Sequence, residues 1–259
     1  MDAKREGART DGVAVRLHRL RKTFGEQVVL DGVDLEVGRG ETVSVLGRSG
    51  GGKSVLLRLI IGLQRPDAGS IQIDGEEVVD LPPDRLNELR KKVGFLFQHA
   101  ALYDSLTVQE NVVFPLRRHT DLVDAERTQR AADILAQMGL EGHLDKMPAE
   151  ISGGMRKRVG LARALALDPE IMLLDEPTAG LDPITAAEII ELIQRLQQAR
   201  KTSAIVVTHD LRSIEALADR VALLHDGAIL TEGSLEEVRK SNDPFVSAFL
   251  SPSLGGKHV

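Results

Sequence analysis

The residues with the clearest chemistry lie in the segment ETVSVLGRSGGGKSVLLRLIIG, from Glu41 to Gly62. A β-branched run is followed by a glycine-rich turn and then by an apolar run with helical spacing. The stretch from Gly47 to Ser54 fits the pattern G-x-x-x-x-G-K-[ST] of a phosphate-binding loop. Side chains at positions 50–52 would hold the backbone away from a triphosphate, whereas glycines let backbone N–H groups face it. We therefore predict a strand, a phosphate-binding loop and a helix rather than an ordinary turn.

The same loop offers a cation and a metal ligand to a bound triphosphate. The helix that begins at Lys53 adds unpaired N–H groups and the positive end of its dipole. Lys53 offers its ammonium group to the phosphates, and Ser54 offers a hydroxyl group to Mg²⁺. The residues that we predict to bind the nucleotide here are Gly47, Arg48, Ser49, Gly50, Gly51, Gly52, Lys53 and Ser54.

Two later buried strands end in side chains suited to the same site. The apolar run 171–174 ends in Asp175 and Glu176, and the run 204–207 lies just before His209. Ligands of doubly wound sheets bind at the carboxyl ends of the strands, so these side chains should face the phosphate-binding loop. Because successive side chains on a strand diverge, we assign Asp175 to Mg²⁺ and Glu176 to the attacking water. An exposed acidic loop and a structural histidine are the alternatives.

Two isolated residues carry weaker signals of nucleotide binding. Phe24 lies in the first turn of a predicted antiparallel β-layer over residues 13–37, and its ring could stack on an adenine. A core or edge phenylalanine is the alternative. A second turn of this layer is predicted at residues 31–32. Gln98 follows a predicted strand over 93–97, where an exposed glutamine is the ordinary interpretation.

A block with helical periodicity runs from residue 107 to 166. Asp124 is predicted to cap one of its helices, and Gly139 is predicted to end that helix. A later helix opens with three small residues whose N–H groups could bind an anion or merely form a cap. These residues are Ser152, Gly153 and Gly154. The basic run 156–158 that follows is, by itself, typical of a solvated face.

The amino-acid composition limits the classes of protein to which this chain can belong. Of the 259 residues, 42% are apolar and 28% are charged, which is enough for a substantial core. The net charge of −6 argues against a nucleic-acid partner held by a general basic surface. The chain has no cysteine, so disulfides and thiolate metal sites are excluded. Arg58 interrupts the longest apolar run, which predicts no membrane span, and residues 1–12 are expected to form a flexible tail.

Six motifs occur in an order that marks a known family. They are the phosphate-binding loop, Gln98, the SGGM helix start, the LLDEP strand end, GLDP and the THD that contains His209. Over about residues 13 to 240 the chain resembles an ATP-binding-cassette (ABC) ATPase subunit. The resemblance implies an α/β P-loop NTPase fold with a RecA-like core, an antiparallel β-subdomain and an α-helical subdomain at about 99–167. Tails over 1–12 and 241–259 would flank this domain.

The resemblance also implies how these motifs act together. Two copies close head to tail around ATP and Mg²⁺, so that Ser152, Gly153 and Gly154 act on the nucleotide of the partner subunit. Phe24 would stack on the adenine, and Asp182 would lie at the seam between the two copies. Glu176 would be the general base, and His209 would contact the γ-phosphate. The implied catalytic residues are Glu176, His209, Lys53 and Gln98, and the implied metal ligands are Ser54, Gln98 and Asp175.

One position departs from the family pattern LSGGQ, because Met155 stands where glutamine is usual. Methionine lacks glutamine's amide, although the serine and glycine groups that face the phosphate are kept. SGGMRKRVGLARAL, QHAALYDSLTVQENVVFPL and GLDPITA resemble the ATPases of Mla-type lipid transporters, which work with MCE proteins. That resemblance implies a subunit peripheral to the cytoplasmic face of the inner membrane, docked on an integral-membrane permease near Tyr103 and moving phospholipid. An MCE protein and a small regulatory subunit are further candidate partners.

Three other functions stay open at this point. An ATPase of an importer for a polar solute, such as an amino acid or a sugar, would share the motifs above. A soluble ABC protein of chromosomes or ribosomes would carry a long coiled coil or two cassettes, whereas Lys53 and Ser152 lie only 99 residues apart (152 − 53). A non-hydrolysing nucleotide switch is the third, although the residues expected for hydrolysis are all present.

Overall fold

The computed structural model describes residues 12–250 of the chain. Its strands are β1 (Val13–Phe24), β2 (Gln27–Gly38), β3 (Thr42–Leu46), β4 (Ala68–Ile73), β5 (Glu76–Glu77), β6 (Val93–Leu96), β7 (Ile171–Asp175), β8 (Ser203–Thr208), β9 (Arg220–His225) and β10 (Ala228–Gly233). Its α-helices are α1 (Lys53–Ile60), α2 (Pro83–Lys91), α3 (Val108–His119), α4 (Asp124–Gln137), α5 (Gly153–Leu165), α6 (Pro183–Arg200), α7 (Leu211–Leu217), α8 (Leu235–Arg239) and α9 (Pro244–Leu250). Short 3₁₀ turns occupy Glu141–His143 and Pro148–Glu150. Within residues 12–250, no helix has both the length and the apolar composition to cross a membrane.

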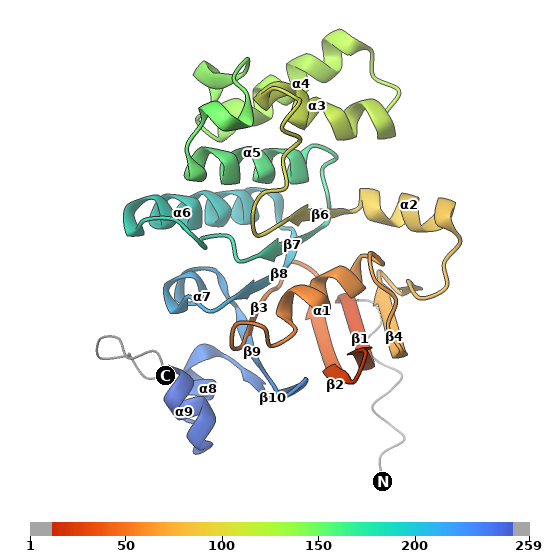
Figure 1. Ribbon diagram of the computed structural model, residues 1–259, viewed down its shortest axis with the longest axis vertical. Helices are drawn as coiled ribbons and strands as arrows, with labels where there is room; N and C mark the ends of the chain where they lie inside the picture. Colours follow the sequence, from red (N-terminus) through yellow and green to blue (C-terminus); the bar gives the residue numbers. More distant parts are fainter. Residues whose placement is uncertain (1–11, 251–259) are drawn as a thin grey trace.

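The strands form two sheets (Figure 1). The larger sheet has the order β10-β9-β3-β8-β7-β6, and all its neighbours are parallel except β10 and β9. The smaller sheet, β2-β1-β4-β5, is antiparallel. Strands β3, β7 and β8 are buried along their whole length, as expected for parallel strands that are covered on both faces. This architecture confirms the predicted α/β P-loop fold with an antiparallel β-layer.

Helices α3, α4 and α5 pack together at one end of the molecule, away from β1 and β2 (Figure 1). Their apolar faces pack in one hydrophobic cluster with α6 and with one face of β7 and β8. A helical unit thus stands on the carboxyl side of strand β6, where the sequence has its helical block. Helix α2 was not predicted, because its nine residues, PDRLNELRK, bury only Leu89 and show little apolar periodicity.

Two local predictions differ from the structure. Strand β2 continues through Asp31 and Gly32 instead of turning there, because Gly32 at φ +83° forms an irregularity within the strand and Asp31 N–H donates to Gly227 O at 2.7 Å. Asp124 is the first residue of α4 and not its cap; the cap position is Val123, whose N–H donates to Glu126 Oε2 at 3.0 Å. The predicted helix end at Gly139, with φ +69°, is confirmed.

The chain beyond residue 240 also differs from the tail that the sequence suggested. Helix α9 buries Val246 and Leu250 against a cluster that contains the last residue of β3. The Phe245 ring stacks on His225 with centroids 3.6 Å apart, and Phe249 lies 5.9 Å from Phe245. Both phenylalanines are half-buried. The packed structure therefore reaches Leu250, while the tail predicted over 1–12 lies, except for its last residue, outside the described residues.

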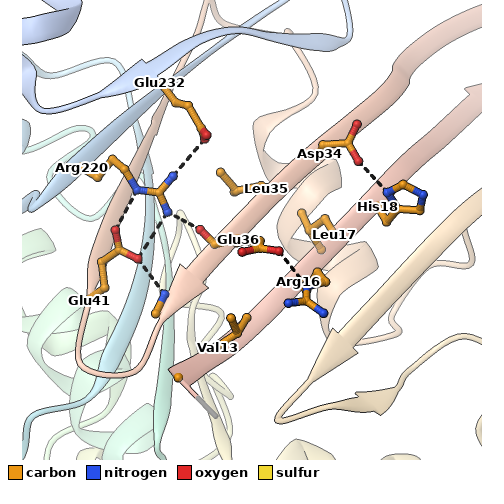
Figure 2. A pocket seen from close by; sticks show the side chains of 12 residues that line it. Val13, Arg16, Leu17, His18, Asp34, Leu35, Glu36, Glu41, Arg220 and Glu232 are labelled. Carbon is orange, nitrogen blue, oxygen red and sulfur yellow. Dashed lines mark hydrogen bonds and ion pairs between the residues drawn. The ribbon is translucent and has the colours of Figure 1, made fainter. Parts of the chain in front are cut away.

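A cavity of about 850 Å³ lies between the β1–β2 ribbon and the edge of the larger sheet (Figure 2). Arg220 on β9 bridges this seam: it donates to Glu41 Oε1 at 2.8 Å, to Glu232 Oε2 at 2.9 Å and to the Glu36 carbonyl. The other charged groups of the lining are also paired with one another, Arg16 with Glu36 and His18 with Asp34. Since these charges satisfy each other, we interpret the cavity as a structural seam and assign it no ligand.

Replacing Arg220 should weaken this seam in a pH-dependent way. Burial acts to raise the pKa of Glu41, but hydrogen bonds from Arg220 and from the Gly38 N–H outweigh it and lower that pKa below the usual 4.5. The stabilisation is therefore complete above pH 4.5 and is lost as the pH falls through the lowered pKa. We expect Arg220→Gln to reduce the free energy of unfolding by about 1.5–3 kcal/mol at pH 7, and by less at pH 4.

Urea unfolding followed by circular dichroism at the two pH values checks this expectation. The matched control is Arg21→Gln, because Arg21 pairs with Asp31 on the exposed side of the same ribbon and should contribute about 0–1 kcal/mol. Equal losses for the two variants at pH 7 would contradict the role given to Arg220.

Candidate active site

The predicted phosphate-binding loop connects the buried strand β3 to helix α1. Lys53 Nζ donates to the carbonyls of Gly47 at 2.8 Å and Arg48 at 3.0 Å, and Gly51 N–H donates to Arg48 O at 3.0 Å. A Cβ at Gly47 would lie 2.7 Å from Leu224 O, so only glycine fits against β9. Gly52 caps α1 with φ +91°, a conformation that favours glycine. The loop is thus curled around its own lysine, with the helix N-terminus behind it.

The lysine of this loop is buried, with 6% of its surface exposed. Burial lowers the pKa of Lys53, and the carboxylate of Glu176, 3.6 Å away, acts in the opposite direction. A buried ammonium group strongly favours a partner of opposite charge. Lys53 is therefore placed where a phosphate group would be attracted.

Ser54 and Asp175 meet at the carboxyl edge of the sheet. Ser54 Oγ donates to Asp175 Oδ1 at 2.8 Å, although 121 residues separate them. Burial raises the pKa of Asp175, and the bond from Ser54 opposes that shift. A hydroxyl and one carboxylate suit Mg²⁺, which keeps waters and phosphate oxygens as its other ligands. Consistent with this, residues 12–250 contain no group of three or more His, Cys, Asp or Glu side chains that could hold a metal ion alone.

Glu176 lies just beyond the end of β7, and its carboxylate contacts His209. His209 Nδ1 lies 2.9 and 3.0 Å from the two carboxylate oxygens of Glu176. Glu176 has φ +46°, a left-handed conformation that is uncommon for residues other than glycine, and its N–H donates to Val207 O at 2.9 Å. Glu176 is buried while the His209 side chain is 57% exposed. His209 therefore connects the buried carboxylate of Glu176 to solvent.

The other predicted residues lie at or next to the ends of β1, β6 and α6. Gln98 has an exposed side chain just after β6. Phe24 is 44% exposed at the end of β1, with Lys22 Nζ 5.2 Å from its ring centroid, so it is not a core phenylalanine, whereas the alternative of an edge phenylalanine stands. Asp182 caps helix α6, accepting from the N–H groups of Ile184 and Thr185, and this capping is by itself a sufficient structural role.

The small residues at the start of α5 lie apart from the phosphate-binding loop (Figure 1). Ser152 caps α5, its Oγ accepting from Met155 N–H at 3.2 Å. A Cβ at Gly154 would lie 2.4 Å from Cγ2 of Thr185 on α6. Nothing in the part of the chain that the structure describes joins Ser152 or Gly154 to residues 47–54 by a hydrogen bond. One chain therefore contains both halves of the predicted site, the phosphate-binding loop and the start of α5, but the two halves do not face each other.

One functional candidate was missed by sequence reasoning. Lys157 belongs to the basic run 156–158 that was expected to face solvent, yet only 5% of its surface is exposed. Its Nζ donates to the carbonyls of Gln98 and Glu176. Burial lowers its pKa to about 8, and the charges of Asp175 and Glu176 oppose that shift. The available signal was its spacing, since position 157 lies three residues after Gly154 and four before the buried Leu161.

Comparison with known proteins agrees with this geometry. The family profile described as ABC transporter matches residues 30–179. A probable ribonucleotide transport ATP-binding protein, mkl, of Mycobacterium leprae is 40% identical over 95% of this chain and 71% of its own length. The methionine import ATP-binding protein MetN of Brucella abortus is 39% identical over 88% of this chain, which spans 62% of that relative.

Solved structures show the same fold. The dimeric structure of MJ0796, a bacterial ABC transporter cassette, has a TM-score of 0.80 and 37% identity, covering 85% of this chain and 98% of the other. A post-hydrolysis dimer of the same cassette bound to ADP and Pi gives a TM-score of 0.79, also at 37% identity, with the same coverage. This chain belongs to the ABC transporter family. It is an ATP-binding subunit that hydrolyses ATP, with Mg²⁺ as the metal.

The close approach of Gly154 to Thr185 generates a stability prediction. Gly154→Ala should reduce the free energy of unfolding by about 1–3 kcal/mol, because the added methyl overlaps Thr185 Cγ2. Adding Thr185→Ser removes that methyl and keeps the hydroxyl that donates to Asp182 Oδ2 at 2.6 Å, so the double variant should recover most of the loss. Thermal unfolding of the single and double variants measures both effects.

Gly153→Ala is the matched control, since the nearest atom to its added Cβ would be Leu181 Cδ2 at an ordinary 3.6 Å. A loss in Gly154→Ala that Thr185→Ser fails to relieve would show that the steric explanation is wrong.

Proposed function

We propose that this chain works as a head-to-tail dimer whose ATP hydrolysis drives lipid transport, specifically of phospholipid, through a partner permease. The observation that carries the catalytic part is the meeting of Lys53, Ser54, Asp175, Glu176 and His209 at one sheet edge. Residues Ser152–Gly154 lie elsewhere in the chain, so a second copy is needed to complete the site. The dimeric state of the related MJ0796 cassette supports this arrangement.

Each residue of the centre then has a chemical role. Glu176 is the general base that takes a proton from the attacking water, and His209 holds that carboxylate and contacts the γ-phosphate. Lys53 neutralises charge that develops on the phosphates, and Mg²⁺ adds positive charge of the same kind. The residues that would hold Mg²⁺ are Ser54, Asp175 and Gln98.

The remaining site residues bind the nucleotide or join the subunits. The exposed Phe24 ring serves as the platform for the adenine. The partner's signature segment supplies the serine hydroxyl and the glycine N–H groups at the start of helix α5. Asp182, exposed at the start of α6, lies at the dimer seam.

A groove beside the helical unit supports docking of a permease. It encloses about 420 Å³ between β6, the loop after it, α3 and α5. Two aromatic pairs line it, Phe95 with Phe97 at 4.1 Å and Tyr103 with Phe114 at 4.7 Å between centroids. Tyr103 is 45% exposed, so its ring is accessible to a partner protein. A short cytoplasmic helix of an integral-membrane protein would bury these rings, so we propose that the chain docks peripherally on the cytoplasmic face of the inner membrane.

The cargo rests on the residue pattern of the signature helix and the loops. The SGGM sequence and its flanks resemble Mla-type ATPases, so an MCE protein and a small regulatory subunit are proposed partners, with no nucleic acid. The second candidate is an ATPase of a polar-solute importer, which the 39% identity to a methionine import protein favours. Purification of the chain from native membranes in mild detergent separates the two. A permease, an MCE protein and bound phospholipid are expected, whereas a solute-binding protein without enriched lipid would contradict the lipid proposal.

Glu176→Gln should retain ATP binding and lower turnover by a factor on the order of 10² or more, because the general base is lost while the shape is kept. Turnover is measured by phosphate release, and ATP binding is measured by calorimetry. Asp210→Asn is a control at the adjacent strand end, since Asp210 caps α7 and does not contact Glu176. Turnover of Glu176→Gln close to that of the unmodified chain would remove Glu176 from this role.

Mixed dimers test whether Ser152 acts across the interface. A subunit with Lys53→Ala paired with a subunit with Ser152→Ala keeps one intact composite site if Ser152 serves the partner's nucleotide. Such mixtures should hydrolyse ATP faster than either parent homodimer. Activity equal to that of the parents would mean that Ser152 serves its own subunit or neither.

A further inference from the structure

Lys157 connects helix α5 to two backbone segments of the catalytic centre. It lies one turn after Gly154, and its buried Nζ donates to the carbonyl of Gln98 and, at 2.9 Å, to the carbonyl of Glu176. Gln98 is 59 residues away along the chain and Glu176 is 19 residues away. One ammonium group therefore fixes the loop after β6 to the end of β7.

The backbone at both ends of this bridge is in an unusual conformation. Glu176 has φ +46°, and Ala100 and Ala101, just after Gln98, have φ +59° and +47°. Left-handed residues other than glycine persist when the surrounding structure holds them. The bond from Lys157 to the Glu176 carbonyl, together with the Ala179 N–H bond to the same oxygen at 3.2 Å, supplies such a restraint.

The same face of α5 also contacts the rest of the loop that follows β6. A Cβ at Gly160 would lie 3.0 Å from the Ala100 Cβ, so the helix and loop are in close contact there. The Arg163 guanidinium donates to the carbonyls of Ala100 at 2.6 Å and Ala101 at 2.7 Å. Positions 157, 160 and 163 follow one another at three-residue spacing and lie on one side of the helix. Loop 98–101 and helix α5 therefore form one rigid unit.

We propose that Lys157 is a positioning residue that ties the signature helix to the catalytic centre of its own subunit. The proposal rests on the head-to-tail dimer of the proposed function. In that dimer, the start of α5 serves the nucleotide of the partner, while Lys157 fixes the backbone of Gln98 and Glu176 in the same chain. An ammonium group has three donors and no acceptor, so once buried it depends on such carbonyls. One helix thus contributes to both composite sites.

Three variants separate positioning from binding and folding. Lys157→Met removes the donors and keeps the length of the side chain, whereas Lys157→Gln restores two N–H donors without charge. The control Arg158→Met lies on the same helix and loses bonds to Met138 O and Glu188, which belong to neither Gln98 nor Glu176. Turnover, the affinity for a non-hydrolysable ATP analogue and the melting temperature are measured for each variant.

For Lys157→Met we expect kcat to fall by a factor on the order of 10–100, since a misplacement of about 1 Å can lower a rate by about 100-fold. The affinity for the analogue should change far less than kcat. Lys157→Gln should recover turnover relative to Lys157→Met, and Arg158→Met should keep its kcat even if its melting temperature falls. A Lys157→Met enzyme with unchanged kcat, or with a loss of affinity as large as its loss of turnover, would overturn the proposal.

Mixed dimers decide which site Lys157 serves. When Lys157→Met is on one subunit and Ser152→Ala on the other, one composite site stays intact if Lys157 acts in its own subunit and Ser152 acts across the interface. When both substitutions are on the same subunit and the partner is unmodified, neither site is intact. Each heterodimer is purified through a different affinity tag on each of its two subunits, so that no homodimer contributes. The first heterodimer should then hydrolyse ATP faster than the second, and the opposite order would overturn the proposal. The separate mixture of Lys53→Ala and Ser152→Ala subunits first tests whether Ser152 acts across the interface. A failure of the proposed dimer is therefore recognised independently of the result for Lys157.

Discussion

The in-register parallel pairing of β3, β8 and β7 is the constraint on which the site depends. Leu46 pairs with Thr208, and Asp175 pairs with Val207, so the three strands end at the same level. That alignment brings the Ser54 hydroxyl to the Asp175 carboxylate, although the two are distant in sequence. A slip of one residue would turn every side chain of a strand to the opposite face and separate these groups. Because the strands are buried on both faces, their apolar side chains fix the register.

At this edge of the sheet, the positive charges of two buried lysines lie close to the negative charges of two carboxylates. Lys53 and Lys157 each have a pKa lowered by burial, and the nearby carboxylates of Asp175 and Glu176 oppose both shifts. Neither lysine reaches solvent, so each depends on carbonyls or carboxylates in the centre. Lys53 is free to exchange its own loop carbonyls for phosphate oxygens, whereas Lys157 bonds the backbone that carries Gln98 and Glu176. We therefore propose that Lys53 binds the nucleotide and that Lys157 positions the backbone of the catalytic centre.

Much of this centre could be predicted from local patterns. The phosphate-binding loop, the acidic strand end and the strand before His209 each combine a buried apolar run with polar residues at its carboxyl end. That pattern places Lys53, Asp175 and His209 at one edge without knowledge of the contacts. Lys157 could not be placed in this way, because its partners are backbone carbonyls that its own segment does not reveal. Helix α9 was not predicted for a similar reason. Its Phe245 stacks on His225, which belongs to strand β9 and is distant in the sequence.

If each nucleotide site is built from two chains, a disulfide between them can be engineered directly, because the sequence contains no cysteine. A chain with Glu176→Gln and Ser49→Cys is mixed with a chain with Glu176→Gln and Gly153→Cys, and both are oxidised with and without ATP and Mg²⁺. We expect a disulfide-linked dimer to form in the mixture when ATP is present, and we expect neither chain to form it alone. If no link forms in the mixture while ATP is bound, or if one chain carrying both substitutions links within itself regardless of ATP, the two-chain site is contradicted.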